Sequence, residues 1–175
     1  KGVYVHSNGD IYLSDTNNHR VLVMDEYGNI RNVFLKPDSV LIPEEYQFKP
    51  LRTEVDSKGY TYILSDGSYY GAMLFAPDKT FLGFYGANYV KRGFLGVLEN
   101  LWNRIFMNNT KRSQINSRLP YCFSDISIDS EDFVYTATGF TDKSQKTEQI
   151  RRLNPGLGKN ILPAVNYADA GHNTS

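Results

Sequence analysis

Cysteine, tryptophan and histidine are scarce in this chain of 175 residues, and long apolar runs are missing. The single cysteine, Cys122, excludes an internal disulfide and a metal centre built from several cysteines. We interpret it as a buried thiol because the run YCFSDISI has the pattern of a core strand. No segment approaches the roughly 18 apolar residues that a membrane-spanning helix needs, so we predict no transmembrane segment. The first residues enter a strand pattern without a visible signal peptide, and we interpret the chain as part of a longer protein.

Net charge is also missing. Nineteen basic side chains balance 19 acidic ones, so no global field draws in nucleic acid, and we predict no nucleic-acid partner. The three histidines, His6, His19 and His172, lack the spacing of a zinc site. We therefore identify no catalytic residues and no metal ligands among them, and we interpret His6 as a turn residue.

Aromatic residues are plentiful, and they favour β structure. The chain has 13 tyrosines and 10 phenylalanines, which suit half-buried pleated surfaces. Three segments share one order of patterns, over about residues 2–35, 51–86 and 121–163. Each has an alternating apolar strand, a tight turn, a second strand with a central tyrosine, and two further strands with turns between them. The central tyrosines are Tyr12, Tyr62 and Tyr135.

This repeated unit predicts one four-stranded antiparallel propeller blade per copy. Asn8-Gly9 and Lys58-Gly59 suit the positive-φ positions of tight hairpins. The fold class that we predict is all-β: a β-propeller fragment of about three blades with one inserted amphipathic helix. The last strand of the third blade is expected over 159–162.

The inserted helix is expected within about residues 87–118. Its apolar residues follow helical spacing: Phe94, Leu95, Leu98, Leu101, Trp102, Ile105 and Phe106. Either this apolar face packs onto the propeller, or the segment docks to a partner or a membrane surface. For the second alternative the candidate docking residues are Lys91, Arg92, Trp102 and Arg104.

The run DIYLSDTNNHRVLVMDEYGNI closely resembles the NHL repeat. The positions that carry the resemblance are Gly9, Asp15, Asn18, His19, Arg20, Val21, Val23 and Asp25. The resemblance implies a propeller, commonly a six-bladed one, and a bacterial protein of the cell envelope or another extracytoplasmic site. Three blades do not close a ring. Either the chain is a fragment, or a homodimer completes the ring.

The signature residues have two interpretations. Asp15 and Arg20 are expected to pair across a turn in which Asn17 and Asn18 suit left-handed backbone. Two roles are therefore open for Asp15, Asn18, His19 and Arg20. Their side chains either hold the strands of the blade together or line a ligand-binding face. Tyr69 and Tyr70 are further candidates for ligand binding, because aromatic rings offer stacking surfaces to sugars and peptides.

Four acidic residues surround the hairpin of the third unit: Asp125, Asp129, Glu131 and Asp132. They form either a solvated turn or a Ca²⁺ site with oxygen ligands. Our leading hypothesis is a non-catalytic binding module for a protein, peptide or carbohydrate, with no cofactor. The alternative, which the family resemblance implies, is a metal-assisted lactonase- or lyase-like enzyme whose active site lies partly outside this chain.

Overall fold

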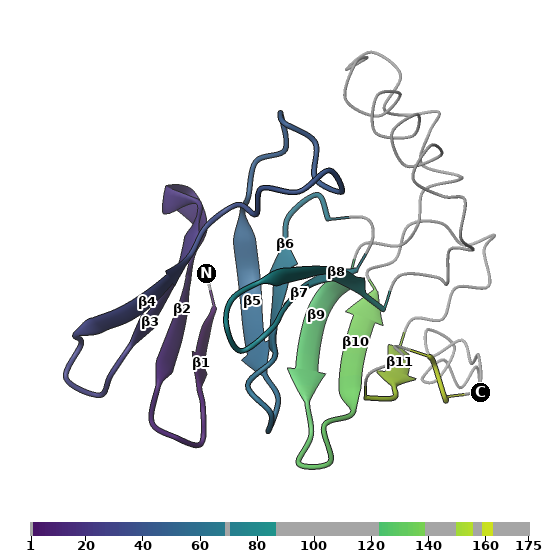
Figure 1. Ribbon diagram of the computed structural model, residues 1–175. Helices are drawn as coiled ribbons and strands as arrows, with labels where there is room; N and C mark the ends of the chain where they lie inside the picture. Colours follow the sequence, from purple (N-terminus) through teal and green to yellow (C-terminus); the bar gives the residue numbers. More distant parts are fainter. Residues whose placement is uncertain (1, 69–70, 87–122, 139–149, 156–158, 163–175) are drawn as a thin grey trace, which may run out of the picture.

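A computed structural model shows three separate antiparallel sheets (Figure 1). It describes residues 2–68, 71–86, 123–138, 150–155 and 159–162. The strands of blade 1 are β1 (Val3–Val5), β2 (Ile11–Asp15), β3 (Arg20–Met24) and β4 (Ile30–Phe34). Those of blade 2 are β5 (Pro50–Val55), β6 (Thr61–Ser65), β7 (Ala72–Phe75) and β8 (Phe81–Tyr85). Blade 3 has β9 (Phe123–Ile128), β10 (Val134–Thr138) and β11 (Ile150–Leu153). The predicted all-β class is confirmed.

The sheet topology follows the predicted repeat. Strands are hydrogen-bonded in the orders β1-β2-β3-β4, β5-β6-β7-β8 and β11-β10-β9. The three central tyrosines, Tyr12, Tyr62 and Tyr135, lie on the second strand of three different sheets. Each sheet is therefore an independent copy of the same up-and-down unit, as in a propeller.

The fourth strand of blade 3 is where the prediction and the structure differ. Of residues 159–162, only Asn160 forms a bridge, and its partner is Leu153. The Asn160 side-chain oxygen accepts hydrogen bonds from the backbone N–H groups of Arg152 and Leu162, at 3.2 and 3.1 Å. The side chain of Asn160 thus takes the place of one backbone acceptor, while the backbone N–H of Ile161 donates to the carbonyl oxygen of Arg152 at 2.9 Å.

Helical structure is sparse in the described part of the chain. The one helical element there is η1, a 3₁₀ turn at Thr16–Asn18. The helix expected within 87–118 lies outside the described residues and is not confirmed. Within those described ranges no helix is long and apolar enough to cross a membrane.

The structure confirms the positive φ values that the sequence predicts at the hairpin glycines Gly9 and Gly59. Gly9 and Gly59 have φ values of 88° and 84°, and the third hairpin places Asp132 at 64°. In each hairpin, this residue donates its backbone N–H to the carbonyl three positions earlier, at 2.9 to 3.1 Å. Aspartate tolerates left-handed backbone better than most residues, which explains how it replaces glycine in blade 3.

Two hydrophobic clusters join the blades. The first lies between blades 1 and 2: Val21, Val23, Phe34, Ile42, Tyr46, Phe48, Ile63, Met73 and Phe75. The second lies between blades 2 and 3: Tyr62, Leu64, Ala72, Tyr85, Phe123, Ile126, Val134 and Leu153. Burial of apolar area between adjacent sheets is therefore the main stabilising term, as expected for repeats that contact only their neighbours.

Candidate functional site

The connections between strands differ sharply at the two ends of the blades. At one end, residues 6–10, 25–29, 56–60, 76–80 and 129–133 are tight hairpin turns. At the other end lie η1, the 35–49 connection and the β6–β7 connection, and the segments before β9 and β11 start from this end too. Figure 1 shows η1 and the 35–49 connection above the sheets and the hairpins of β1–β2, β5–β6 and β9–β10 below them. We call these ends the long-connection face and the tight-turn face.

The signature residues of blade 1 lie at the long-connection face and bind one another. Asn18 donates its amide hydrogens to both carboxylate oxygens of Asp15, at 2.9 Å each. Arg20 Nε donates to Asp15 Oδ2 at 2.9 Å, so the predicted pairing is confirmed. The hydrogen bond from Asn18, followed by that from Arg20, lowers the pKa of the Asp15 carboxyl below its ordinary value.

The left-handed residue of this turn is His19, with φ 56° and ψ 40°, where we had expected Asn17 and Asn18. The two asparagines belong to the 3₁₀ turn itself, and the chain reverses one residue later. His19 Nδ1 lies 2.9 Å from the carbonyl oxygen of Phe48 and must donate, since a carbonyl only accepts. The conformation of His19 thus directs its ring from blade 1 to the connection that leads into blade 2.

A second bond strengthens this junction. Thr16 donates its hydroxyl to the carbonyl oxygen of Pro50 at 2.6 Å, at the start of β5. The signature turn is therefore bonded to two backbone carbonyls, that of Phe48 in the 35–49 connection and that of Pro50 at the start of blade 2. These contacts show a structural role for the turn, while ligand binding by its residues stays a prediction.

The 35–49 connection folds over the top of blades 1 and 2. Its residues Ile42, Tyr46 and Phe48 belong to the first hydrophobic cluster. Tyr46 donates its hydroxyl to Ser65 Oγ at 2.6 Å, and that oxygen also accepts the backbone N–H of Lys49 at 2.9 Å. The buried side of this connection is thereby fixed to β6. Its outer side is exposed at Glu44 and Glu45, among other residues.

A polar cluster lies on neighbouring innermost strands of blades 2 and 3. Arg52 Nε on β5 lies 3.1 Å from Asp125 Oδ1 on β9. Burial, followed by the charge of Asp125, raises the pKa of the half-buried Glu54 to about 7, although Arg52 opposes the change. Sequence reasoning missed this cluster. The signal available was the alternation of Arg52 and Glu54 with the apolar-facing positions of β5.

The comparisons with known proteins bear first on blade 1. Residues 1–24, which include β1, β2, η1 and most of β3, match the family model of the NHL repeat. Blade 1 is therefore similar to an NHL repeat. A search of curated proteins finds no match.

Two solved structures match most of this chain in a comparison of folds. The structure of streptogramin B lyase matches over 88% of this chain and 37% of its own, with 11% identity and a TM-score of 0.50. A crystal structure of a protein of unknown function from Bacteroides caccae matches over 95% of this chain and 60% of its own, with 11% identity and a TM-score of 0.40. The first likeness supports the propeller fold. This chain spans little more than a third of that lyase structure.

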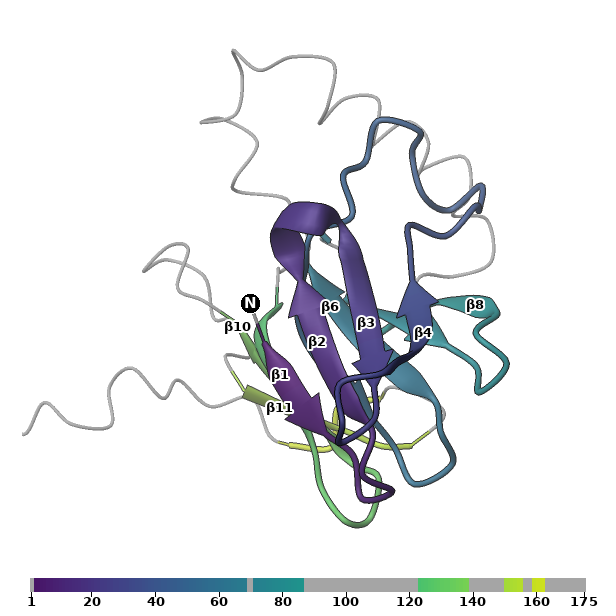
Figure 2. The same cartoon turned by 90° about the vertical axis from the view of Figure 1, so that its left-hand side faces the viewer.

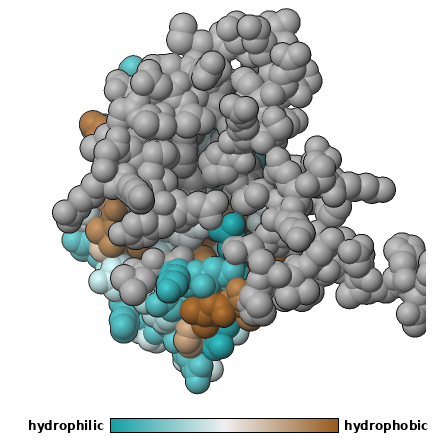
Figure 3. Space-filling model, turned by 90° about the vertical axis from the view of Figure 1, so that its right-hand side faces the viewer, coloured by the Kyte–Doolittle hydropathy of each residue, from teal (hydrophilic) through white to brown (hydrophobic). Residues whose placement is uncertain are grey.

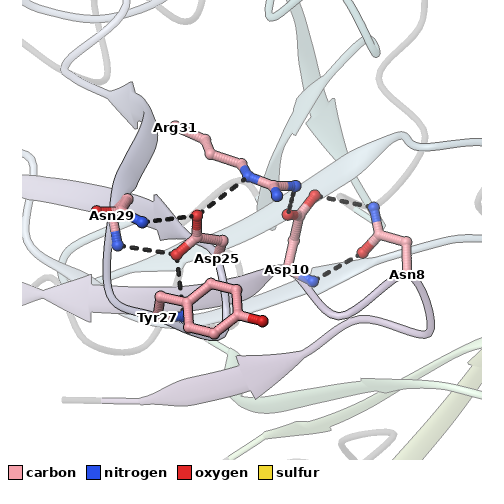
Figure 4. Close-up of polar contacts among 6 residues, drawn as sticks. All are labelled: Asn8, Asp10, Asp25, Tyr27, Asn29 and Arg31. Carbon is pink, nitrogen blue, oxygen red and sulfur yellow. Dashed lines mark hydrogen bonds and ion pairs between the residues drawn. The ribbon is translucent and has the colours of Figure 1, made fainter.

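The tight-turn face of the NHL-repeat blade holds a self-contained polar network (Figure 4). Arg31 lies between two carboxylates, with Nη1 2.8 Å from Asp10 Oδ1 and Nε 3.9 Å from Asp25 Oδ2. Asp25 also accepts the backbone N–H groups of Tyr27 and Asn29, at 3.0 and 2.9 Å. These carboxylates are occupied in shaping two adjacent turns, which indicates a structural network.

The four acidic residues of the third hairpin do not converge. Asp129 caps its own turn, accepting the backbone N–H groups of Glu131 and Phe133 at 2.9 Å each. Asp132 accepts the backbone N–H and hydroxyl of Ser57 in blade 2, at 2.8 and 2.6 Å. The described residues contain no group of three or more histidine, cysteine or acidic side chains that could hold a metal ion. The proposed Ca²⁺ ligands, Asp125 included, therefore do not fit a metal site.

Several predicted site residues lie outside the described residues. They are Tyr69, Tyr70, Lys91, Arg92, Trp102 and Arg104. Their roles in ligand binding and in partner or membrane docking stay predictions.

Proposed function

We propose that this NHL-repeat chain is a non-catalytic binding module, and that it recognises a protein, peptide or carbohydrate at its long-connection face. The observation that carries the proposal is the difference between the two ends of the blades. The five-residue hairpin turns lie at one end, whereas the connections 35–49 and 66–71 and the segments that follow β8 and β10 start from the other, where the short β2–β3 turn also lies. Binding residues concentrate on variable loops held by a rigid scaffold.

The described side chains suit a polar ligand. Asn17, Glu44, Glu45 and Asp66 are exposed at this face and offer amide and carboxylate groups for hydrogen bonding. Their connections are fixed from beneath by the Tyr46 hydroxyl and by the cluster between blades 1 and 2. Such a preorganised surface loses little conformational entropy when a ligand binds.

An array experiment tests the proposal. The labelled chain is applied to oligosaccharide and peptide arrays, and the strongest ligand is titrated against surface variants. We expect Asn17→Ala and Glu45→Ala to weaken binding about tenfold, as the loss of one good polar contact does. Tyr27→Ala, an exposed change on the tight-turn face, is the matched control and should leave affinity unchanged. Equal loss in the control, or no binding to either array, would refute the proposed site.

The residues outside the described ranges enter the same proposal. If Tyr69 and Tyr70 stack on the ligand, alanine at either position should weaken the same titration. If Lys91, Arg92, Trp102 and Arg104 dock to a membrane, the chain should sediment with anionic vesicles at low salt, and Trp102→Ala should reduce that fraction. Placement at a bacterial cell envelope is part of the proposal too, and cell fractionation of the source bacterium tests it.

The inner-strand cluster supports a second candidate, an enzyme of the lactonase or lyase type. Glu54, with a pKa raised to about 7, has the property of a group that gives and takes protons near neutral pH. Turnover of a lactone panel that follows a pKa near 7 and is abolished by Glu54→Gln would favour this candidate. No turnover, with array binding present, would favour the binding module.

A further inference from the structure

A groove lies at the outer rim of the molecule, where β4 of blade 1 runs beside the β7–β8 hairpin of blade 2. Its residues come from the end of β4, the start of the 35–49 connection and both sides of the 76–80 turn. Figure 2 shows β4 and β8 on the same side of the molecule, with the 35–49 connection leaving the upper end of β4. Both walls belong to blades 1 and 2, which pack directly on each other, so no further blade is needed to form the groove.

Three phenylalanines line a hollow in this groove: Phe34 from blade 1, and Phe75 and Phe81 from blade 2. The ring centroids of Phe34 and Phe75 are 5.2 Å apart, and those of Phe75 and Phe81 are 5.5 Å apart. Phe34 and Phe75 belong to the first hydrophobic cluster, which holds them in place from beneath. The hollow has a volume of about 210 Å³, below the roughly 300–1,000 Å³ of sites that enclose a drug-sized ligand. It therefore suits one large apolar or aromatic side chain.

The neighbouring edge of β4 is protected against pairing with another strand. β4 is the outermost strand of blade 1, and an outer edge of this kind can add a strand from a partner. Asn32 Oδ1 accepts the backbone N–H of Val33 at 2.9 Å and the ammonium group of Lys79, also at 2.9 Å. An incoming strand would have to displace these hydrogen bonds. We therefore expect recognition through a side chain in the hollow rather than through an added strand.

The charges along the groove favour a cationic partner. A second hollow shares Asp38 with the first and continues along the connection to Glu44. The carboxylates of Asp38 and Glu44 are exposed and have no hydrogen-bond or ion-pair partner among the described residues. The ammonium groups of Lys79 and Lys36 already donate to neutral oxygens, the first to the Asn32 amide and the second to the backbone carbonyl of Glu44. We call the two hollows together the rim groove.

The opposite side of the molecule offers a contrast. Figure 3 shows the side that carries blade 3, where the hydrophobic atoms in view form small patches between hydrophilic ones. Scattered apolar residues of this kind are common on protein surfaces and need no partner. In the rim groove an exposed apolar side chain adjoins a hollow instead: Leu35 is 61% exposed and lines the same hollow as the three phenylalanines. This combination indicates an interaction site.

We propose that the rim groove binds an extended peptide segment of another protein. A large apolar side chain of that peptide enters the phenylalanine-lined hollow, and an adjacent lysine or arginine lies against Asp38 and Glu44. The inference rests on the proposed function, because the groove ends on the 35–49 connection of the long-connection face, and it names the class of peptide that is bound.

Fluorescence polarisation with four labelled peptides tests the proposal. The probes are short peptides in a glycine-serine frame, and their two central positions hold Phe-Lys, Ala-Lys, Phe-Glu or Ala-Glu. We expect the Phe-Lys probe to bind most tightly, and loss of either the ring or the positive charge to raise the dissociation constant about tenfold. Equal dissociation constants for the four probes, or binding by none of them, would overturn the proposal.

A charge reversal in the groove identifies the carboxylate. Asp38→Lys should raise the dissociation constant of the Phe-Lys probe about tenfold and lower that of the Phe-Glu probe. Asp66→Lys is the matched control, since it makes the same change at an exposed aspartate of the β6–β7 connection that lines neither hollow. An Asp38→Lys protein that still prefers the Phe-Lys probe would refute the proposed contact.

A leucine substitution tests the hollow. Leu35→Ala should weaken binding of the Phe-Lys probe about tenfold, because it shortens an apolar wall of the hollow, and should leave the Ala-Lys probe unchanged. Ile30→Ala, at the opposite end of β4, is the control, because Ile30 is 58% exposed and lies outside the groove. Circular dichroism checks that both variants fold. If Asn17→Ala weakened peptide binding while Asp38→Lys and Leu35→Ala did not, the peptide would bind elsewhere on the long-connection face, so the proposed function would stand and this inference would fail.

Discussion

Ser14 of blade 1 and Thr53 of blade 2 share a buried hydrogen bond, with their hydroxyl oxygens 3.0 Å apart. Ser14 comes just before the NHL signature turn, and Thr53 lies at the centre of the innermost strand of the next blade. The bond sits in the same interface as the apolar cluster between the two blades. It therefore ties the position of the signature turn to the packing of the sheets.

This pair gives a first prediction. Thr53→Val keeps the shape but leaves the buried Ser14 hydroxyl unpaired, and we expect the free energy of unfolding to fall by about 1–3 kcal/mol. The double variant Ser14→Ala/Thr53→Val removes both polar groups and should recover a large part of that loss. Urea denaturation of the four proteins in a double-mutant cycle measures the coupling. Strict additivity of the two single changes would show that the bond contributes nothing.

A second prediction concerns Gly86 at the end of β8. Its φ is +77°, and an added Cβ would lie 2.6 Å from Leu153 Cδ1 and 3.1 Å from two ring carbons of Phe123. Gly86→Ala should therefore disturb the packing of blade 3 on blade 2 and cost about 2–4 kcal/mol, from overpacking and left-handed backbone together. Thermal unfolding measures the loss.

Gly9→Ala is the control for Gly86→Ala. Gly9 has a φ of +88°, but nothing lies within 4 Å of an added Cβ. It should show the backbone cost alone, about 1–2 kcal/mol. Equal losses in the two variants would mean that the contact with Leu153 is not a constraint.

The fold was predictable because its signals are local and repeated. Alternating apolar positions around Tyr12, Tyr62 and Tyr135 marked one strand in each blade, and Asn8-Gly9 and Lys58-Gly59 marked two hairpins. Cross-strand register and turn chemistry then follow from the sequence within each blade. The repeated unit could therefore be recognised without knowing any contact between blades.

Two of the misses have a common physical cause, because they depend on contacts between distant segments. His19 takes the left-handed position, and its ring reaches Phe48, a residue 29 positions away. Glu54 acquires its raised pKa from burial and from Asp125 on another blade. The third miss is closer in sequence: the Asn160 side chain accepts the backbone N–H of Arg152, eight positions away, where we had expected only strand pairing. None of these partners is visible in the local pattern.

A third prediction tests how the 35–49 connection is held. Tyr46→Phe removes the hydroxyl that donates to Ser65 and to the carbonyl oxygen of Asp66, while the ring stays in the cluster. We expect faster amide hydrogen exchange in residues 36–49 and a small loss of global stability, about 1 kcal/mol. Tyr27→Phe, at an exposed tyrosine of the opposite face, is the control. Unchanged exchange in Tyr46→Phe would show that the apolar contacts alone fix this connection.

The last prediction is the dependence of stability on pH at Glu54. Its pKa in the folded chain, about 7, exceeds the ordinary value of 4.5, so the folded state binds the proton more tightly than the unfolded state. The resulting stabilisation is complete below pH 4.5 and is lost as the pH rises through 7. Glu54→Gln should remove this dependence and be the more stable protein at pH 8.5, by on the order of 1 kcal/mol after allowance for solvent screening of a half-buried group.

Two further variants separate the causes of the Glu54 shift. Asp125→Asn removes the neighbouring charge that helps to raise the pKa of Glu54, so the transition should move to lower pH. Glu44→Gln changes an exposed glutamate of the 35–49 connection and should leave the wild-type profile intact. Chemical denaturation at intervals between pH 4 and 9 measures all four proteins. Parallel profiles for wild type and Glu54→Gln would show that Glu54 ionises as freely in the folded chain as in the unfolded one, and that the cluster with Arg52 and Asp125 does not shift it.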